Sequence, residues 1–135
     1  MPEFTIQYHG PYVCDAKHHE SGETLRIVTA RDEQPYDHPS PSDLLAAALG
    51  SCMVQTLAIA ARVKFDLELR DITVRITSDF DEKTHLYRRI DLTFDIPQDV
   101  PEDLRPRLER SAGRCPVHKS LHPDIEISAT YNWGA

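Results

Sequence analysis

The chain has 135 residues and a mass of 15.4 kDa, which is the size of one ordinary domain, and no linker interrupts it. We therefore predict a single domain over residues 1–135. A formal charge of −7 repels a phosphate backbone, which excludes nucleic acid as the expected partner. The longest apolar stretch, Leu44 to Gly50, is much shorter than the roughly 20 residues that span a bilayer, so we expect no membrane association. Three cysteines are too few for a secreted disulfide framework, which favours reduced thiols and a cytoplasmic location.

Short alternating stretches in the first part of the chain predict three antiparallel strands, at residues 4–8, 12–14 and 24–28. Turn residues separate them, at Gly10–Pro11 and at Ser21–Gly22. Residues 32–41 contain three prolines and few apolar residues. This segment is therefore expected to be a loop that leads into the next element.

The strongest helix signal follows this loop. Ser40 is a favourable N-cap, Pro41 suits the first turn, and Asp43 completes a Ser-x-x-Asp capping box. From Ser42 to about Arg62 the sequence is apolar and has no polar face, and no charge lies between Asp43 and Arg62. This pattern is typical of a helix buried on all sides, so we expect it to form the centre of the core.

The second half of the chain alternates again and then becomes helical. Apolar residues alternate from Leu67 to Ile76, apart from a slip at Asp71 that is interpreted as a bulge, and they alternate again from Leu86 to Ile96 after a hairpin loop. Two helices and a strand complete the expected elements, in the order 101–112 with a kink at Pro106 and an end at Gly113, 115–122, and 125–131. Strands in runs predict the α+β class with mostly antiparallel sheets.

The cysteines are the residues most able to carry chemistry. Cys52 lies ten residues into the apolar helix, where burial is expected to raise the pKa of its thiol, and it is either a small core residue or a nucleophile. Cys115 directly precedes Pro116, so its sulfur is expected beside free amide groups that favour the thiolate, unless it serves only as an N-cap. Cys14 lies in an early strand and is interpreted as structural.

A metal site is the alternative use of the second cysteine. Cys115, His118 and His122 have i, i+3 and i+7 spacing on the expected helix, and zinc accepts such ligands. A structural zinc site normally needs four ligands, however, and the chain has no second paired-cysteine cluster. We therefore predict no metal, and we place His118 on the helix surface or in a hydrogen bond near Cys115.

Two separated segments resemble the OsmC/Ohr family. The segment from Ser40 to Cys52 is similar to the family's Pro-led, Ala-rich central helix, and Cys115 to Leu121 is similar to its second motif, in which Cys-Pro opens a short helix. The resemblance implies mostly antiparallel sheets wrapped around a buried central helix, in an intertwined homodimer with a site at each end of the interface.

The same resemblance implies a thiol peroxidase that reduces organic hydroperoxides and needs no cofactor. Cys52 is then the peroxidatic thiolate that becomes a sulfenic acid, and Cys115 is the resolving thiol that forms a Cys52–Cys115 disulfide. A dithiol or lipoyl-type reductant is expected to restore the pair.

The chain departs from the family pattern beside the helix start. Ser42 stands where the best-defined peroxidases have glutamate, although Asp43 is adjacent, and the expected activating arginine is not identifiable. His18 or His19 is the alternative activating residue, and His118 is a further candidate for lining the site. Ser42 favours the alternative function, a non-peroxidatic OsmC-like protein that binds a small apolar ligand or senses oxidation at the dimer-interface pocket.

Overall fold

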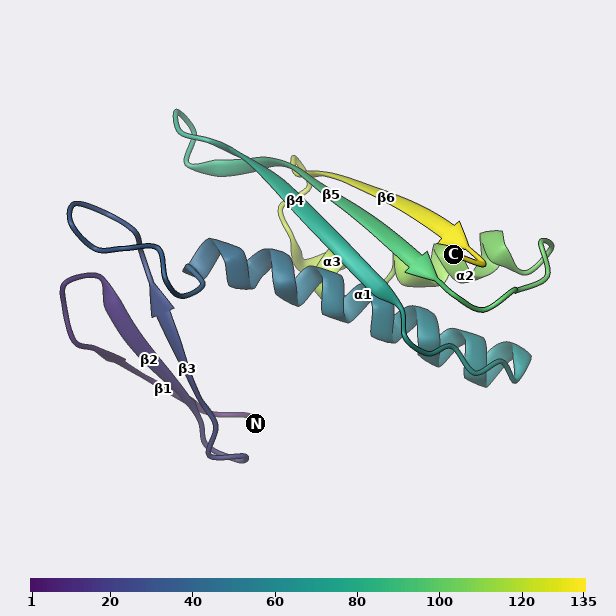
Figure 1. Ribbon diagram of the computed structural model, residues 1–135, viewed down its shortest axis with the longest axis horizontal. Helices are drawn as coiled ribbons and strands as arrows, with labels where there is room; N and C mark the ends of the chain where they lie inside the picture. The colour runs from purple at the N-terminus through teal and green to yellow at the C-terminus, as the bar shows by residue number, and fades with distance from the viewer. The chain divides into compact units, whose positions relative to one another are not determined.

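The computed structural model describes all residues from 1 to 135 and divides the chain into two compact units, Met1–Leu45 and Ala46–Ala135 (Figure 1). The long helix α1, Pro41–Phe65, begins in the first unit and continues into the second. The prediction of a single domain over residues 1–135 stays a prediction. The observed class is α+β, with one antiparallel sheet and one mixed sheet.

The first unit contains a three-stranded antiparallel sheet in the order β1-β2-β3. Its strands are β1 Phe4–Tyr8, β2 Val13–His18 and β3 Thr24–Val28, which confirms the three predicted strands and extends the second one. Because side chains alternate along a strand and paired residues share a face, Phe4, Ile6 and Tyr8 lie on the same face as Ala16 and Leu25. This apolar face is largely exposed, since Phe4, Ile6 and Tyr8 keep 58–62% of their accessible surface.

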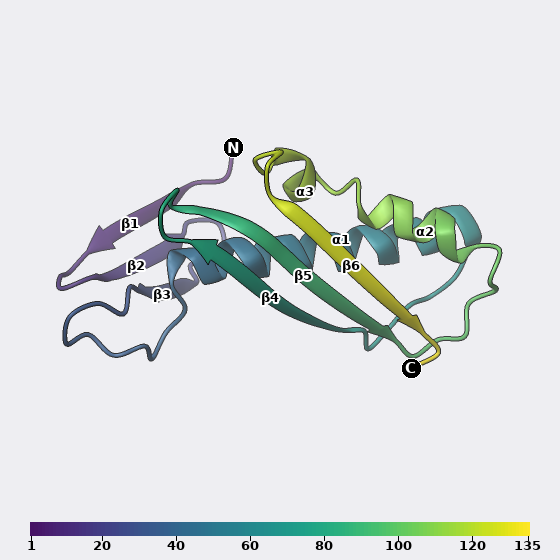
Figure 2. The same ribbon diagram turned by 90° about the horizontal axis from the view of Figure 1, so that it is seen from above.

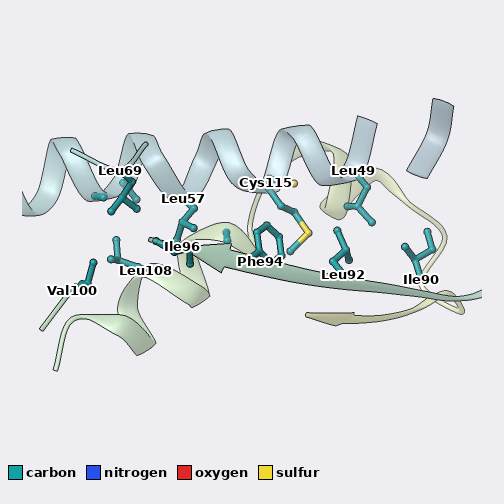
Figure 3. Packing of buried hydrophobic residues seen from close by; sticks show 14 residues of the cluster. Leu49, Leu57, Leu69, Ile90, Leu92, Phe94, Ile96, Val100, Leu108 and Cys115 are labelled. Atoms are coloured by element: carbon teal, nitrogen blue, oxygen red, sulfur yellow. The ribbon is translucent and has the colours of Figure 1, made fainter. Parts of the chain in front are cut away.

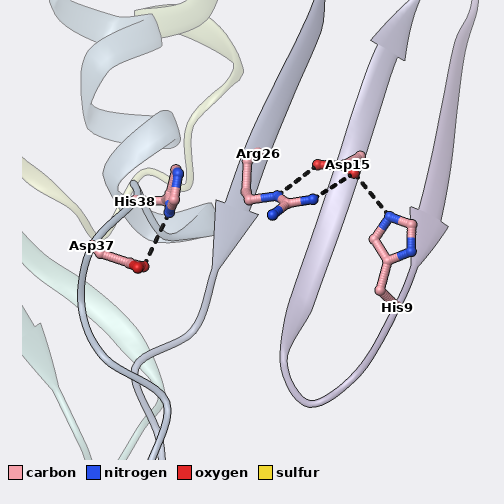
Figure 4. A network of polar contacts seen from close by, with 5 residues as sticks. All are labelled: His9, Asp15, Arg26, Asp37 and His38. Atoms are coloured by element: carbon pink, nitrogen blue, oxygen red, sulfur yellow. Dashed lines mark hydrogen bonds and ion pairs between the residues drawn. The ribbon is translucent and has the colours of Figure 1, made fainter.

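Charged side chains on β2 and β3 join across the polar face of the same sheet. Arg26 donates two hydrogen bonds of 3.0 Å to the carboxylate of Asp15, and His9 Nε2 lies 2.8 Å from the same carboxylate (Figure 4). The Arg26 guanidinium, assisted by His9, holds the pKa of Asp15 at about 2. A second pair, Asp37 and His38, lies in the loop before α1.

The start of α1 is fixed by the predicted capping box. Asp43 N–H donates to Ser40 Oγ at 3.1 Å, and Ser40 N–H donates to Asp43 Oδ2 at 2.9 Å. The Tyr36 hydroxyl also donates to Asp43. The helix therefore begins at Pro41 as expected, and it runs to Phe65, three residues beyond the predicted end.

The prediction that this helix is buried on all sides is wrong within the chain. Its fully buried residues, such as Leu49, Met53 and Leu57, form one stripe, whereas Ile59 and Val63 keep 62% and 78% of their accessible surface. Exposed residues of α1 therefore include these two apolar side chains beside the polar Gln55 and Arg62. By length and composition alone α1 is able to cross a membrane, but the core helices of soluble proteins pass the same test, and one stripe of α1 packs on a sheet.

The second unit contains a three-stranded sheet that covers one side of α1. Its strands are β4 Thr73–Asp81, β5 Leu86–Ile96 and β6 Glu126–Trp133, in the order β4-β5-β6, with β4 antiparallel and β6 parallel to β5 (Figure 2). The predicted inward face of β5 is confirmed, because Ile90, Leu92, Phe94 and Ile96 are at most 1% exposed. These side chains pack against the buried stripe of α1 (Figure 3).

The strand predicted from Leu67 to Ile76 is correct only in its second half. Residues 66–72 are irregular, Asp71 has a φ of 56°, and β4 begins at Thr73. The bulge predicted at Asp71 is instead found between Asp79 and Phe80. The left-handed conformation of Asp71 lies just before the first residue of β4, and alternation alone does not reveal it.

Two short helices connect β5 with β6. Helix α2, Arg105–Ala112, begins four residues later than predicted, and Pro106 lies in its first turn, where no intrahelical hydrogen bond is lost, so the predicted kink does not form. Gly113 follows its last residue, as predicted. Helix α3, Pro116–Ser120, begins at the predicted Cys-Pro step and ends two residues earlier than expected.

Candidate active site at the Cys52–Cys115 pair

Two cysteines that are 63 positions apart in the sequence meet in the second unit. Cys52 is the twelfth residue of α1, and Cys115 is the N-cap of α3. Both sulfurs are free thiols, and the Cys115 thiol donates a hydrogen bond to the sulfur of Cys52. Cys52 is partly exposed, whereas Cys115 is completely buried in the core cluster. The pair therefore has one accessible and one inaccessible sulfur.

The Cys52 thiol is the more acidic of the two. Burial by itself raises its pKa, but three donors outweigh burial and lower the pKa below its usual value: the backbone N–H of Val117, the thiol of Cys115 and the hydroxyl of Thr56. The prediction that burial alone raises the pKa of Cys52 is confirmed, but these three hydrogen bonds reverse the net shift. Hydrogen bonds to the charged form of a thiol favour the thiolate, which is the nucleophilic form.

Cys115 shows the opposite behaviour. Its sulfur accepts a hydrogen bond from the backbone N–H of His118 at 3.3 Å, as an N-cap does. Complete burial nevertheless raises its pKa, and the neighbouring Cys52 raises it further. The prediction that the helix start makes Cys115 a thiolate is wrong, because desolvation outweighs the His118 and Val117 amides.

Val117 and Thr56 are the contacts that the sequence prediction missed. Thr56 lies four residues after Cys52, a spacing that places two helical side chains on one face. That signal was present in the sequence. The contact of the Val117 N–H with Cys52 could not be predicted from the sequence, because the direction of this N–H depends on how α3 packs against α1.

Two groups on neighbouring elements complete the environment of Cys115. Tyr131 of β6 stacks on Phe94 with ring centroids 4.7 Å apart. Burial, together with the charges of Glu109 and Cys115, raises the pKa of Tyr131 to about 12. Burial also raises the pKa of Glu109, on α2. Tyr131 therefore stays protonated and neutral beside the buried thiol at physiological pH.

The candidate activating histidines lie in the first unit. His18, the last residue of β2, has Ser21 and Glu20 as its side-chain partners, and it also lines a groove of about 610 Å³ on the apolar sheet face. His19 pairs with Thr5 and Glu3. All of these partners belong to the first unit, and the activating role of either histidine stays a prediction.

The remaining predicted residues have separate places. Ser42 and Asp43 lie in the first turn of α1, where the Asp43 carboxylate is already engaged by Ser40 and Tyr36. His118 contributes its backbone N–H to Cys115 and is partly buried on α3. Cys14 lies on β2 in the first unit and is partly buried. No group of three or more His, Cys, Asp or Glu side chains is arranged to hold a metal ion.

Comparison with known proteins agrees with this geometry. Residues 32–130 match the family described as OsmC-like protein. The chain belongs to the OsmC-like family. Its fold is also similar to that of a protein from Psychrobacter arcticus 273-4 named for osmotic stress induction and detoxification response. The two chains share 26% identity with a TM-score of 0.88, over 97% of this chain and 96% of that one.

Two more distant solved structures share the OsmC-like fold. An OsmC-like protein from Mycoplasma pneumoniae has a TM-score of 0.83 at 16% identity, over 100% of this chain and 98% of that one. The organic hydroperoxide resistance protein OhrB of Bacillus subtilis has a TM-score of 0.70 at 17% identity, over 97% of both chains. At these identities the likeness shows the fold alone. No curated protein sequence matches the chain.

Proposed function

We propose that this OsmC-like protein is a thiol peroxidase that reduces organic hydroperoxides, with Cys52 as the peroxidatic and Cys115 as the resolving cysteine. One observation carries the proposal: a partly exposed cysteine lies beside a fully buried one, and the surrounding donors lower the pKa of the first while burial raises that of the second. Organic hydroperoxide resistance proteins of the same fold support it.

The first step is a nucleophilic displacement on oxygen. The Cys52 thiolate attacks the outer oxygen of the hydroperoxide, the O–O bond breaks, and the alkoxide leaves and takes a proton to become an alcohol. Cys52 is thereby oxidised to a sulfenic acid. The Val117 amide and the Thr56 hydroxyl stabilise the thiolate that begins this step.

The second step closes the disulfide. The Cys115 sulfur attacks the sulfur of the Cys52 sulfenic acid, and the leaving hydroxide takes the Cys115 proton and departs as water. A dithiol then reduces the Cys52–Cys115 bond by exchange and is itself oxidised to a disulfide. Such a cycle needs a reducing compartment, and the cytoplasm is the location that we propose.

The protein is proposed to act as a homodimer. The apolar face of the first sheet is exposed, and three strands with an uncovered apolar face form an unstable arrangement in water. A second copy that covers this face removes the exposed surface. Light scattering at micromolar concentration is expected to give about 31 kDa, twice the mass of one chain. A stable monomer contradicts the dimer.

Two cysteine variants test the peroxidase. Cys52→Ser is expected to abolish consumption of cumene hydroperoxide, because oxygen replaces sulfur with little change in volume and removes the nucleophile. Cys115→Ser is expected to complete the first turnover and then to accumulate sulfinic and sulfonic acid at Cys52, since no neighbouring thiol traps the sulfenic acid.

Stopped-flow kinetics measures the consumption of hydroperoxide, and mass spectrometry measures the over-oxidation of Cys52. Cys14→Ser is the matched control, and it is expected to keep the full rate. Undiminished consumption by Cys52→Ser refutes the assignment. Slow oxidation of wild-type Cys52 by every hydroperoxide instead supports the alternative, a non-peroxidatic protein that binds an apolar ligand or senses oxidation, which Ser42 in place of glutamate favours.

A further inference from the structure

The two sulfurs of the cysteine pair are the acceptors for the open amides at the start of α3. The first helical hydrogen bond of α3 joins Lys119 N–H to the carbonyl of Cys115 at 3.1 Å. The N–H groups of Val117 and His118 come before it and have no carbonyl acceptor within the helix. The His118 N–H donates to the Cys115 sulfur at 3.3 Å, and the Val117 N–H donates to the Cys52 sulfur.

Few other contacts hold α3 in place. The helix has five residues, Pro116–Ser120, and none of them is fully buried. Its apolar packing on the core cluster comes from Val117, which is partly buried. A helix of little more than one turn is unstable by itself in water. The contacts at its N-terminus therefore have a large share in keeping it folded.

A disulfide between the two cysteines requires their sulfurs to move toward each other. The S–S bond is about 2.05 Å long, much shorter than a hydrogen bond between two sulfurs, which is the contact in the dithiol protein. Cys52 lies in a helix of 25 residues, seven of which are buried. Because α1 is anchored along this buried stripe and α3 is not, Cys115 and the start of α3 take up most of the movement. The Cys115 sulfur then leaves its capping position.

Bond formation also removes the charge that the Val117 N–H stabilises. The Cys52 thiolate is an ionised acceptor, and hydrogen bonds to ionised groups are about twice as strong as those between neutral groups. In the disulfide the Cys52 sulfur is neutral. Oxidation therefore weakens the Val117 contact and withdraws the cap at the same time, and both changes act on one short helix.

We infer that α3 is a redox-sensitive element, which is folded when Cys52 and Cys115 are thiols and loosened when they form a disulfide. The two thiols lose two electrons and two protons, which convert the hydroperoxide to an alcohol and water in the proposed cycle, and a dithiol returns them. The place of this change in a catalytic cycle rests on the proposed function. The loosening itself needs only the disulfide, whichever oxidant forms it.

The same coupling makes the disulfide easy to reduce. The free energy that the folding of α3 contributes to the dithiol protein is missing from the disulfide protein, so a dithiol reductant is favoured in the exchange. The coupling is reciprocal. A substitution that weakens α3 therefore shifts the thiol–disulfide equilibrium toward the disulfide.

Amide hydrogen exchange compares the two redox forms directly. The full chain with Cys14→Ser, in which only the pair reacts, is reduced with a phosphine or oxidised with diamide, which accepts the two electrons and two protons and becomes a hydrazine. The amides of residues 117–121 are expected to exchange about five-fold faster in the disulfide form, the factor that corresponds to the loss of one N-cap, whereas the amides of α2 keep their rates. Adding Cys115→Ser keeps a capping side chain but prevents the disulfide, so diamide is expected to leave these rates unchanged.

Matched glycine variants test the reciprocal effect. Lys119 on α3 and Arg110 on α2 are both exposed helical residues with the same charge. Lys119→Gly is expected to shift the equilibrium with glutathione about three-fold toward the disulfide, because glycine is less favourable than lysine in a helix. Arg110→Gly is expected to leave the equilibrium unchanged. Lys119→Ala removes the same charge but keeps a good helix former, so it is expected to match the wild type.

The results separate this inference from the proposed function. Equal exchange of residues 117–121 in the two redox forms overturns the inference, as does an equal shift by Lys119→Gly and Arg110→Gly or by Lys119→Gly and Lys119→Ala, and each leaves the peroxidase in place. A protein that no hydroperoxide oxidises but whose α3 loosens with diamide refutes the peroxidase and supports the inference. A cysteine pair that diamide does not join, as judged by mass spectrometry, overturns both.

Discussion

Gly50 controls how closely α1 approaches β4, two residues before Cys52. A Cβ atom at this position would lie 2.3 Å from Ile76 Cδ1 and 3.3 Å from Ile76 Cγ1. Contacts as short as 2.3 Å do not occur between carbon atoms, so Gly50→Ala forces the Ile76 side chain or the helix to move. The helix conformation itself favours alanine, which makes the two effects opposite in sign.

The magnitudes decide the outcome. Alanine in place of glycine stabilises a helix interior by about 1 kcal/mol. Overpacking a close contact costs about 1–3 kcal/mol. Gly50→Ala alone is therefore expected to lower the free energy of unfolding by about 0–2 kcal/mol. Ile76→Val removes the Cδ1 atom that clashes, at a cost of about 0.5–1.5 kcal/mol. In the Ile76→Val protein, Gly50→Ala is then expected to stabilise by several tenths of a kcal/mol.

Urea denaturation of the four proteins in this double-mutant cycle gives the coupling energy. We expect a favourable coupling of about 1–2 kcal/mol between alanine at 50 and valine at 76, because residues in contact do not act additively. The rate of Cys52 alkylation in the single variant reports whether the pair moves with the helix. Stabilisation of about 1 kcal/mol by Gly50→Ala alone refutes the close-packing argument, since helix propensity then acts unopposed.

Three further predictions address the cap, the thiol and the first sheet. Ser40→Ala is expected to lower the free energy of unfolding by about 1 kcal/mol in urea, because Asp43 N–H loses its acceptor. Thr56→Val is expected to raise the pKa of Cys52, read from the pH dependence of its alkylation, and an unchanged profile contradicts the Thr56 contact. Asp15 has its pKa lowered from 3.8 to about 2, so its contribution to stability is complete above pH 4 and is lost as the pH falls toward 2. Arg26→Gln is expected to move the NMR titration of Asp15 upward, and an unmoved midpoint contradicts the ion pair.

The elements that depend on local signals were predictable from the sequence. Ser40 and Asp43 are within three residues of each other, and the capping box formed as expected. The inward face of β5 followed from strict alternation, which only one register satisfies. The two motifs that carry the family resemblance also lie in single segments, and the match over residues 32–130 confirms the family.

The errors came from features that depend on long-range packing or on a single backbone angle. Alternation from Leu67 onward looked like a strand, but a positive φ at Asp71 delays β4 to Thr73. An apolar helix looked fully buried, but composition does not reveal which side is covered within one chain. The exposed residues Ile59 and Val63 are the consequence.

The relative acidity of the two thiols shows why a site is harder to read than a fold. A helix start offers several free amides, and the sequence indicates only that Cys115 is near them. In the structure the His118 N–H acts on Cys115, whereas the Val117 N–H lowers the pKa of both thiols. Burial then separates the pair, because Cys115 has no water to stabilise its charge and Cys52 has some. The short helix thus favours the thiolate of the exposed cysteine, while burial keeps the Cys115 thiol protonated beside it, which is the order of acidity that the proposed peroxidatic and resolving roles use.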